Sequence, residues 1–391
     1  MSHSSFIANW NYPTAVRVGA GRVNELASAC TTLNMQAPLL VTDPGLAELP
    51  MVESILKHCR ETGLRIALFK QIKANPTGEN IINGVAAYRA GKHDGVIAFG
   101  GGSALDAGKA IALMIGQDRP LWDFEDIGDN WKRVNAAGMA PVIAVPTTAG
   151  TGSEVGRASV ITDQALQIKK IIFHPNMLPQ LVILDPELTL DLPAKMTAAT
   201  GMDALSHNLE AYCAPYFHPM AEGIAIEGIR LVKDYLPRVI KDGHDLEART
   251  QLLVASSMGA TAFQRGLGAM HALAHPLGAI YDAHHGRLNA ILMPYVLLAN
   301  RRAIESKITR LANYLDINDG FNGFIDWILL LRQEIGIEHG LLEINIDGQH
   351  LKRIAKMATE DAAATSNPIL FNVEQYQHLL FAAIHGELSA L

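Results

Sequence analysis

The 391-residue sequence predicts an α/β domain with a parallel sheet, followed by an all-helical domain. The first observation is a set of five short apolar runs, at residues 37–43, 65–70, 95–102, 141–148 and 181–186. Helix-like segments lie between most of these runs, such as 47–62 and 79–91. Strands that are apolar along their whole length and alternate with helices are typical of a parallel sheet covered on both faces.

The second observation is a change of pattern at about residue 188, where the strand signal ends and helical periodicity begins. Helices are predicted at 194–213, 220–241, 246–263, 302–315, 322–335 and 373–389. A chain of this length is also long for a single core. We therefore expect two domains, 1–187 and 188–391.

The bulk composition is that of a globular protein, 49% hydrophobic and 18% charged, with a formal net charge of −7. This sign argues against nucleic acid or an anionic membrane as the main partner. Three scattered cysteines without a CxxC pair indicate reduced thiols. The N-terminus has no basic region followed by an apolar run, and no apolar stretch reaches membrane-spanning length. We expect a cytoplasmic protein.

A glycine-rich turn follows the third apolar run. Gly101, Gly102 and Ser103 stand directly after a predicted strand and directly before an amphipathic helix. Glycines let the backbone approach a phosphate, and a helix N-terminus presents unpaired N–H groups to it. The pattern predicts a nucleotide-binding turn, although it is not GxGxxG. The alternative is a tight strand-to-helix turn without a ligand.

Two further strand ends support nucleotide binding. The loop 145–154 gathers hydroxyls and glycines, among them Thr147, Thr148 and Thr151, which can donate hydrogen bonds to phosphate or ribose oxygens. Asp43 ends an early strand, where a carboxylate accepts from ribose hydroxyls and repels a 2′-phosphate, so NAD is favoured over NADP. The alternative for the loop 145–154 is a polar surface turn without a ligand, and the alternative for Asp43 is an aspartate that only begins a turn.

Metal-ligating residue types recur at helical spacing in the second half. Asp203 and His207 are four residues apart on a predicted helix, and therefore lie on one face. Alone, this pair is better explained as a hydrogen bond between neighbours. The segment 271–286 changes that interpretation, because it holds four of the chain's 15 histidines. Aspartate and histidine ligands together suit Zn²⁺ or Fe²⁺ and argue against Mg²⁺ or Ca²⁺.

Within that segment, His271 and His275 are again four residues apart on a predicted helix. We expect Pro276 to bend or end this helix. His284 and His285 are expected in a short loop that ends at Gly286. The residues alone do not select which histidines complete a site with the upstream pair.

Eight ordered blocks carry a resemblance that runs along nearly the whole chain: NYPTAVRVGAGRVNEL, VTD, NPT, GGGSALDAGKA, PTTAGTGSEV, ILDPELT, GMDALSHNLEAY and GLGAMHALAHPLGAIYDAHHG. On these blocks the sequence resembles the iron-containing (group III) alcohol dehydrogenases, whose fold is shared with dehydroquinate synthase. The resemblance implies metal ligands at Asp203, His207, His271 and His285, and a histidine at 275 that lines the substrate site and relays a proton. It implies cofactor contacts at Asp43, Asn75, Gly101, Gly102, Ser103, Thr147, Thr148, Thr151, Lys169, Leu188 and Leu192.

The function so implied is a metal-dependent, NAD(H)-linked alcohol dehydrogenase. It would interconvert a small alcohol or diol and its aldehyde or ketone by hydride transfer, and relatives imply a homodimer. Iron follows from the resemblance, and Zn²⁺ is the alternative. Arg157 could receive a substrate carboxylate, which would extend the substrates to hydroxy acids, or lie on the surface or at an interface. The competing functions are a dehydroquinate-synthase-like lyase and a non-catalytic nucleotide-binding relative.

Overall fold

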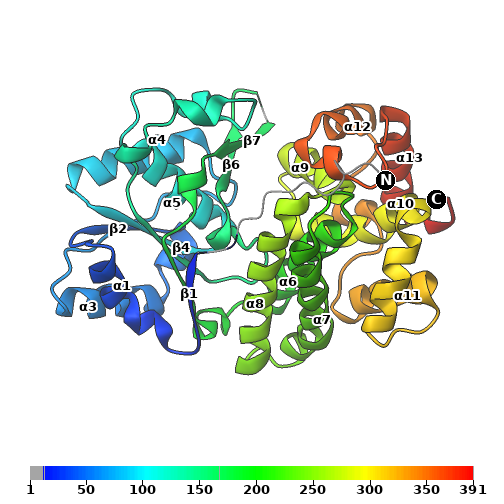
Figure 1. Ribbon diagram of the computed structural model, residues 1–391, viewed down its shortest axis with the longest axis horizontal. Coiled ribbons are helices and arrows are strands. Elements are labelled where there is room, and N and C mark those ends of the chain that lie inside the picture. The colour runs from blue at the N-terminus through cyan, green and yellow to red at the C-terminus, as the bar shows by residue number, and fades with distance from the viewer. Residues whose placement is uncertain (1–11, 13, 167, 391) are drawn as a thin grey trace. The chain divides into compact units, whose positions relative to one another are not determined.

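The computed structural model of the protein describes residues 12, 14–166 and 168–390 (Figure 1). The chain divides into two compact units, one spanning Tyr12–Asp191 and the other containing the residues from Leu192 onward. Among the described residues, no helix is long and apolar enough to cross a membrane.

The first unit contains a six-stranded sheet in which every pair of neighbours is parallel. Its strands, in spatial order, are β1 (Ala15–Val18), β8 (Leu181–Leu184), β5 (Val142–Pro146), β4 (Gly95–Gly100), β2 (Pro38–Val41) and β3 (Ala67–Phe69). The five apolar runs form five of these strands, which confirms the predicted parallel sheet. The edge strand β1 was not predicted, because its four residues are mostly exposed and lack a continuous apolar run.

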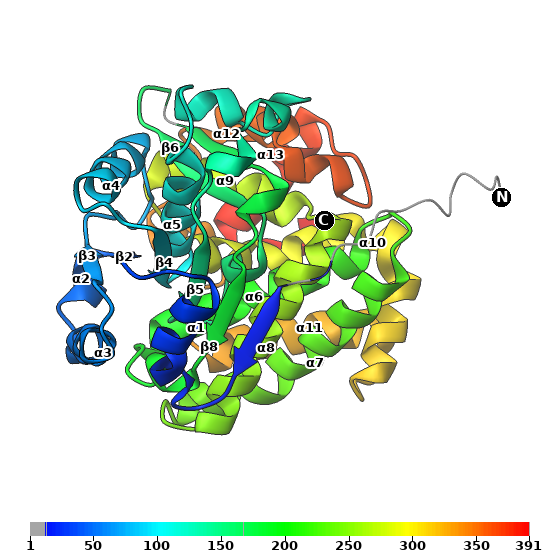
Figure 2. The ribbon, with the colours of Figure 1, turned by 60° about the vertical axis from the view of Figure 1, so that its left-hand side comes forward.

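Helices cover both faces of the sheet, as the apolar strands predict. Ile97 and Phe99 of β4 pack in a core with residues of α1 (Leu26–Thr32) and α3 (Pro50–Glu61). On the opposite face, a side chain at Gly108 of α5 (Gly102–Met114) would meet Ala98 and Val96. Figure 2 shows α5 beside β4, and α4 (Gly78–Ala90) packs against α5 in turn.

An antiparallel hairpin in the first unit was also missed by the sequence patterns. It consists of β6 (Ala158–Asp163) and β7 (Ile168–Phe173). The backbone of Thr162 donates a hydrogen bond to the Pro76 carbonyl oxygen over 2.7 Å, which attaches β6 to the loop before α4. β7 carries two lysines among its apolar residues, so it does not match the continuous runs of the main sheet.

The second unit is helical throughout its described residues, as predicted. Its helices are α6 (Ala194–Cys213), α7 (Pro219–Lys241), α8 (Leu246–Ala262), α9 (Ala269–Tyr281), α10 (His285–Tyr314), α11 (Gly320–Glu334), α12 (Leu351–Glu360) and α13 (Val373–His385). The helices α6, α7 and α8 pack against one another, and Figure 1 shows them side by side. The bounds of α6 agree with the predicted 194–213.

Two helix boundaries in this unit differ from those expected from the sequence. Pro276 does not end α9, which continues to Tyr281 and stops where Asp282 adopts a left-handed conformation with a φ of 51°. The expected loop before Gly286 ends two residues earlier, because His285 is already the first residue of α10. The helix predicted at 302–315 is therefore only the C-terminal half of α10, which runs from His285 to Tyr314. Gly286 resembles a loop residue in sequence and is instead a close packing position within the first helical turn. The helix α12 was not predicted.

Candidate metal and nucleotide sites

The helix α6 positions the first two candidate metal ligands. Pro193 precedes its first residue, Ala194, and an uninterrupted helix then places Asp203 and His207 on one face. Both side chains are buried, with exposed fractions of 2% and 5%. The burial of both ionisable side chains distinguishes this arrangement from neighbours on a solvated face, which was the alternative from sequence.

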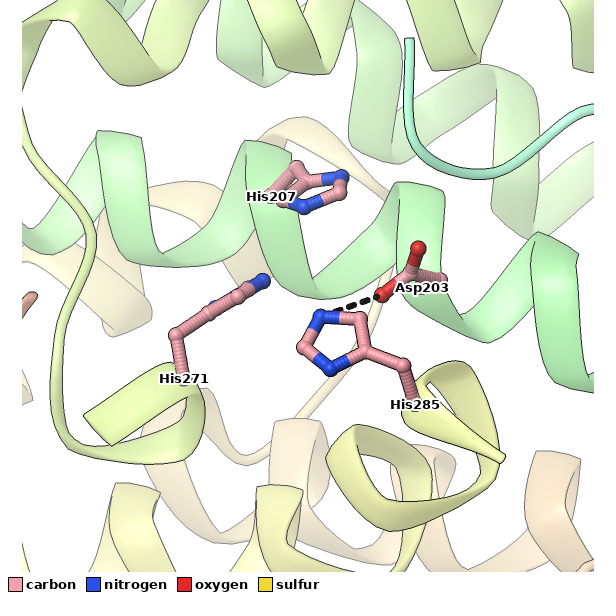
Figure 3. Close-up of side chains that lie close together, drawn as sticks. All are labelled: Asp203, His207, His271 and His285. Atoms are coloured by element: carbon pink, nitrogen blue, oxygen red, sulfur yellow. Dashed lines mark ion pairs between the residues drawn. The ribbon is translucent and has the colours of Figure 1, made fainter. Parts of the chain in front are cut away.

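The remaining two candidate ligands come from α9 and α10. His271 lies in the first turn of α9 and is 1% exposed, whereas His285 begins α10 and is partly exposed. Figure 3 shows the four side chains converging from three helices. One ligand atom from each of Asp203, His207, His271 and His285 lies within 4.8 Å of all the others. The predicted set is therefore brought together in space, with His285 Nε2 at 3.7 Å from Asp203 Oδ1.

A second carboxylate orients His271. Glu210 Oε2 accepts a hydrogen bond from His271 Nδ1 over 2.6 Å, so the Nε2 atom carries the free lone pair that faces the cluster. Glu210 also accepts from the backbone N–H groups of Gly268 and Met270, at 2.8 Å each, and so anchors the start of α9. Burial raises the pKa of Glu210 to about 7 and holds the pKa of His271 well below its usual range. Sequence spacing did not reveal Glu210, which lies one turn beyond His207.

His275, the predicted catalytic residue, lies beside this cluster. Its ring stacks almost parallel to that of His285, with centroids 5.5 Å apart, and its Nδ1 is 2.8 Å from Asp361 Oδ2. Asp361 also caps the short helix Ala362–Ser366 by accepting from the backbone N–H of Ala363. Asp361 is 86 positions from His275 in the sequence, so no local signal could have identified it.

The donor set fits a divalent transition metal. One carboxylate oxygen and three imidazole nitrogens are the ligand types that suit Fe²⁺ and Zn²⁺. The low pKa of His271 keeps its imidazole neutral, which is the form that binds a metal. The hydrogen bond to Glu210 supplies the outer partner that ligating histidines usually have.

The predicted phosphate-binding residues gather at the carboxyl ends of the parallel strands. Gly101 precedes α5 and Gly102 begins it, directly after β4, while Thr147 and Thr148 follow β5. A side chain at Gly102 would meet Thr151 Cγ2 at 2.5 Å, so the loop after β5 lies against the N-terminus of α5. This edge is where open α/β sheets bind ligands, and the helix N-terminus suits a diphosphate.

Three other predicted cofactor residues lie around the same edge. Asp43 follows β2 and caps α2 (Pro44–Ala47), its Oδ1 accepting from the Leu46 backbone N–H over 2.9 Å. Asn75 lies in the loop before α4, next to Ala74, whose carbonyl oxygen accepts a hydrogen bond from Ser103 Oγ. Lys169 of β7 is paired in register with Thr162, the residue that binds this loop.

Leu188 and Leu192 differ from the other predicted cofactor residues. Leu188, in the short helix Pro186–Thr189, is 7% exposed and packs in the core formed with α1 and α3. The Leu192 carbonyl oxygen accepts from Arg249 Nη2 in the second unit. The Arg157 guanidinium lies 5.6 Å from the centroid of the Phe173 ring, across the β6–β7 hairpin.

A buried ion pair beneath the glycine-rich turn was missed. Lys109 of α5 is 1% exposed, and its Nζ lies 3.2 Å from Asp106 Oδ1 and donates to the Ala158 carbonyl oxygen. Asp106 also accepts hydrogen bonds from Ser153 Oγ and from the Val160 backbone N–H. These contacts attach both the loop after β5 and the strand β6 to α5. The i, i+3 spacing in LDAGK was the available signal.

Comparisons with known proteins agree with this architecture. Residues 13–186 match the family "Iron-containing alcohol dehydrogenase", and residues 197–384 match "Fe-containing alcohol dehydrogenase family, C-terminal". A 4-hydroxybutyrate dehydrogenase of Cupriavidus necator is 36% identical, and the alignment covers 94% of this chain and 98% of the relative.

Solved structures give the same result. A crystal structure of 1,3-propanediol oxidoreductase is 33% identical, covers 97% of this chain and 100% of its own, and has a TM-score of 0.92. A sulfoacetaldehyde reductase from Bifidobacterium kashiwanohense, solved in complex with NAD⁺, is 27% identical with a TM-score of 0.88 and covers 96% and 98% of the two chains. The chain belongs to the iron-containing alcohol dehydrogenase family and is an oxidoreductase.

Proposed function

We propose that Asp203, His207, His271 and His285 bind one divalent ion, Fe²⁺ by preference and Zn²⁺ as the alternative. The observation that carries this proposal is the convergence of four ligand atoms within 4.8 Å, three of the four residues being buried. The family supports iron. The chemistry of the ligands suits both ions.

The nucleotide is NAD(H) in this proposal, bound at the carboxyl ends of β2, β4 and β5. The glycine turn at 101–103 and the threonines at 147, 148 and 151 receive the diphosphate, and Asn75 and Lys169 contribute from neighbouring segments. The Asp43 carboxylate disfavours the 2′-phosphate of NADP. Leu188 and Leu192 are proposed for the nicotinamide side, where Leu188 would act from its place at the border of the core.

The reaction is hydride transfer between nicotinamide and a small alcohol or diol, or the corresponding aldehyde or ketone. When bound, the ion supplies a positive charge that lowers the pKa of the alcohol and polarises the carbonyl. His275 is the group that exchanges a proton, and Asp361 holds its Nδ1 so that Nε2 remains available. The similar proteins are named for 4-hydroxybutyrate, 1,3-propanediol and sulfoacetaldehyde, all of which are short molecules. These names support a short substrate for this protein, and 4-hydroxybutyrate extends the range to hydroxy acids.

We also propose that the protein forms a homodimer and that it is located in the cytoplasm. A homodimer is supported by β1, which lies at the edge of the six-stranded sheet and whose Val16 and Val18 side chains are 36% and 38% exposed. A cytoplasmic location is supported by Cys30, Cys59 and Cys213, all of them buried free thiols.

The test is a panel of short alcohols, diols and hydroxy acids, with metal-free protein reconstituted with Fe²⁺ or Zn²⁺ and NADH followed by absorbance. Asp203→Ala should abolish turnover and metal binding while leaving NADH binding intact. Asp326→Ala, which removes an exposed carboxylate from α11, should change neither. A folded, metal-free Asp203→Ala protein with full activity would overturn the proposal. NAD-dependent conversion without net NADH would favour a lyase instead.

A further inference from the structure

A buried amide lies against the candidate metal ligands. Asn289 is one turn beyond His285 on α10 and is 0% exposed. Its Nδ2 is 2.9 Å from Asp203 Oδ1 and 3.2 Å from the Nε2 atoms of both His271 and His285. A single amide nitrogen therefore contacts three of the four converging ligands, and these come from three different helices.

The chemistry of the amide fixes what these contacts are. An amide NH₂ only donates hydrogen bonds, so Asp203 Oδ1 and both imidazole Nε2 atoms act as acceptors. If His271 Nε2 accepts a hydrogen bond, the proton of the neutral ring is on Nδ1. The hydrogen bond from His271 Nδ1 to Glu210 independently requires this tautomer. The two N–H groups of the Asn289 amide therefore donate to three acceptor atoms, and the lone pairs of these acceptors are directed toward the same amide nitrogen.

The other end of the amide is unsatisfied. Asn289 Oδ1 is buried and has no hydrogen-bond partner among the described residues. A buried acceptor without a partner is costly. Reversing the amide would place Oδ1 against three acceptor atoms, which is worse. The ligand cluster, and not the surroundings of Oδ1, therefore dictates the orientation of this side chain.

We propose that Asn289 is a positioning residue of the metal site. Before the ion binds, its NH₂ group holds three ligand atoms together by donating to the lone pairs that the ion would use. Once the ion is bound, the hydrogen bond to Asp203 Oδ1 keeps this carboxylate oriented to present one oxygen. Outer partners of this kind change metal affinity by about 10- to 100-fold. The inference rests on the proposed metal site.

The test compares Asn289→Leu with wild type, with Co²⁺ as the probe. Metal-free protein is titrated with Co²⁺ against a competing chelator, and the visible absorption of the bound Co²⁺ reports its coordination. We expect at least tenfold weaker binding and an altered absorption spectrum, because the Asp203 carboxylate is free to rotate. The melting temperature of the metal-free protein is measured in parallel.

Asn300→Leu is the matched control. Asn300 is a buried amide on the same helix, bound to Val296 and Asn367 and to none of the four ligands. The Asn300→Leu substitution should lower the melting temperature of the protein without changing the absorption spectrum of bound Co²⁺. If Asn289→Leu yields no folded protein, the smaller change Asn289→Ser serves the same comparison.

The outcomes separate the two proposals. Wild-type affinity and an unchanged spectrum in a folded Asn289 variant overturn the role of Asn289 and leave the metal site intact. Equal changes in both asparagine variants show a general packing effect and also overturn it. Failure of wild-type protein to bind one Co²⁺ per chain overturns the proposed metal site itself.

Discussion

Gly286 lies so close to α6 that a Cβ atom at this position would come within 2.3 Å of the Ala199 carbonyl oxygen. The same atom would be 2.9 Å from Asp203 Cβ. Backbone cannot move aside as a flexible side chain can, so a side chain at 286 must separate α10 from α6. The glycine after His285 thus permits the approach that brings His285 toward Asp203.

Gly286→Ala should therefore damage the metal site. We expect a loss of about 1–3 kcal/mol in the free energy of unfolding, the usual cost of overpacking, and a lower metal content. Gly223→Ala on α7 is the control, since a Cβ there meets nothing within 4 Å. It should be neutral or slightly stabilising. Urea unfolding and metal analysis measure both effects, and a fully loaded Gly286→Ala protein of normal stability would contradict the prediction.

Glu210→Gln should weaken metal binding without abolishing it. Glutamine keeps the size of the side chain but removes one of two oxygens that together accept from His271, Gly268 and Met270. We expect about 10- to 100-fold lower affinity, as for other partners of ligating histidines. Competition with a chelator measures it. Unchanged affinity in this variant would mean that Glu210 only anchors the start of α9.

Asp43→Asn should relax the choice of cofactor. Asparagine retains the capping interaction with the Leu46 backbone N–H, so α2 stays intact while the charge is lost. The ratio of kcat/KM for NADP to that for NAD should rise by about tenfold, which corresponds to about 1.4 kcal/mol. Steady-state kinetics with both cofactors check this, and an unaltered ratio would remove Asp43 from the nucleotide site.

Asp106→Asn should destabilise the first unit. It leaves the Lys109 ammonium buried without its carboxylate, which typically costs about 3–5 kcal/mol. Burial already lowers the pKa of Lys109. The double variant Asp106→Asn/Lys109→Met should recover part of the loss, because no unpaired charge remains. Urea unfolding of Asp106→Asn, Lys109→Met and the double variant tests this, and additive effects would refute the coupling between the two residues.

Asp245→Ala should lower stability in a pH-dependent way. Asp245 caps α8 through the Ala248 backbone N–H and pairs with Arg238. The backbone hydrogen bond and this ion pair lower the pKa of Asp245 in the folded state. Its contribution, about 1 kcal/mol, is therefore complete above the unfolded pKa of about 3.9 and is lost as the pH falls through the folded pKa. Thermal unfolding at pH 7 and pH 3 should show the difference shrinking in acid.

The sequence predicted the elements with strong local signals and missed those decided by packing. Continuous apolar runs identified five strands of the sheet, and i, i+4 spacing on α6 identified Asp203 and His207. The start of α10 was predicted at residue 302 but lies at His285, and this misplacement concealed the i, i+4 relation of His285 and Asn289. Glu210 and Asp361 acquire their roles only through distant contacts with His271 and His275.

The distance along the chain between the residues of the metal site bears on how the protein folds. Asp203 and Asn289 are 86 positions apart, yet they are in direct contact. Closing a loop of this length carries an entropic cost that is recovered only when α6 packs against α10. The ligand set therefore does not exist in a chain whose helices have formed but not yet docked. Metal uptake should appear late in refolding, and a partly unfolded protein should release its ion before its helical content declines.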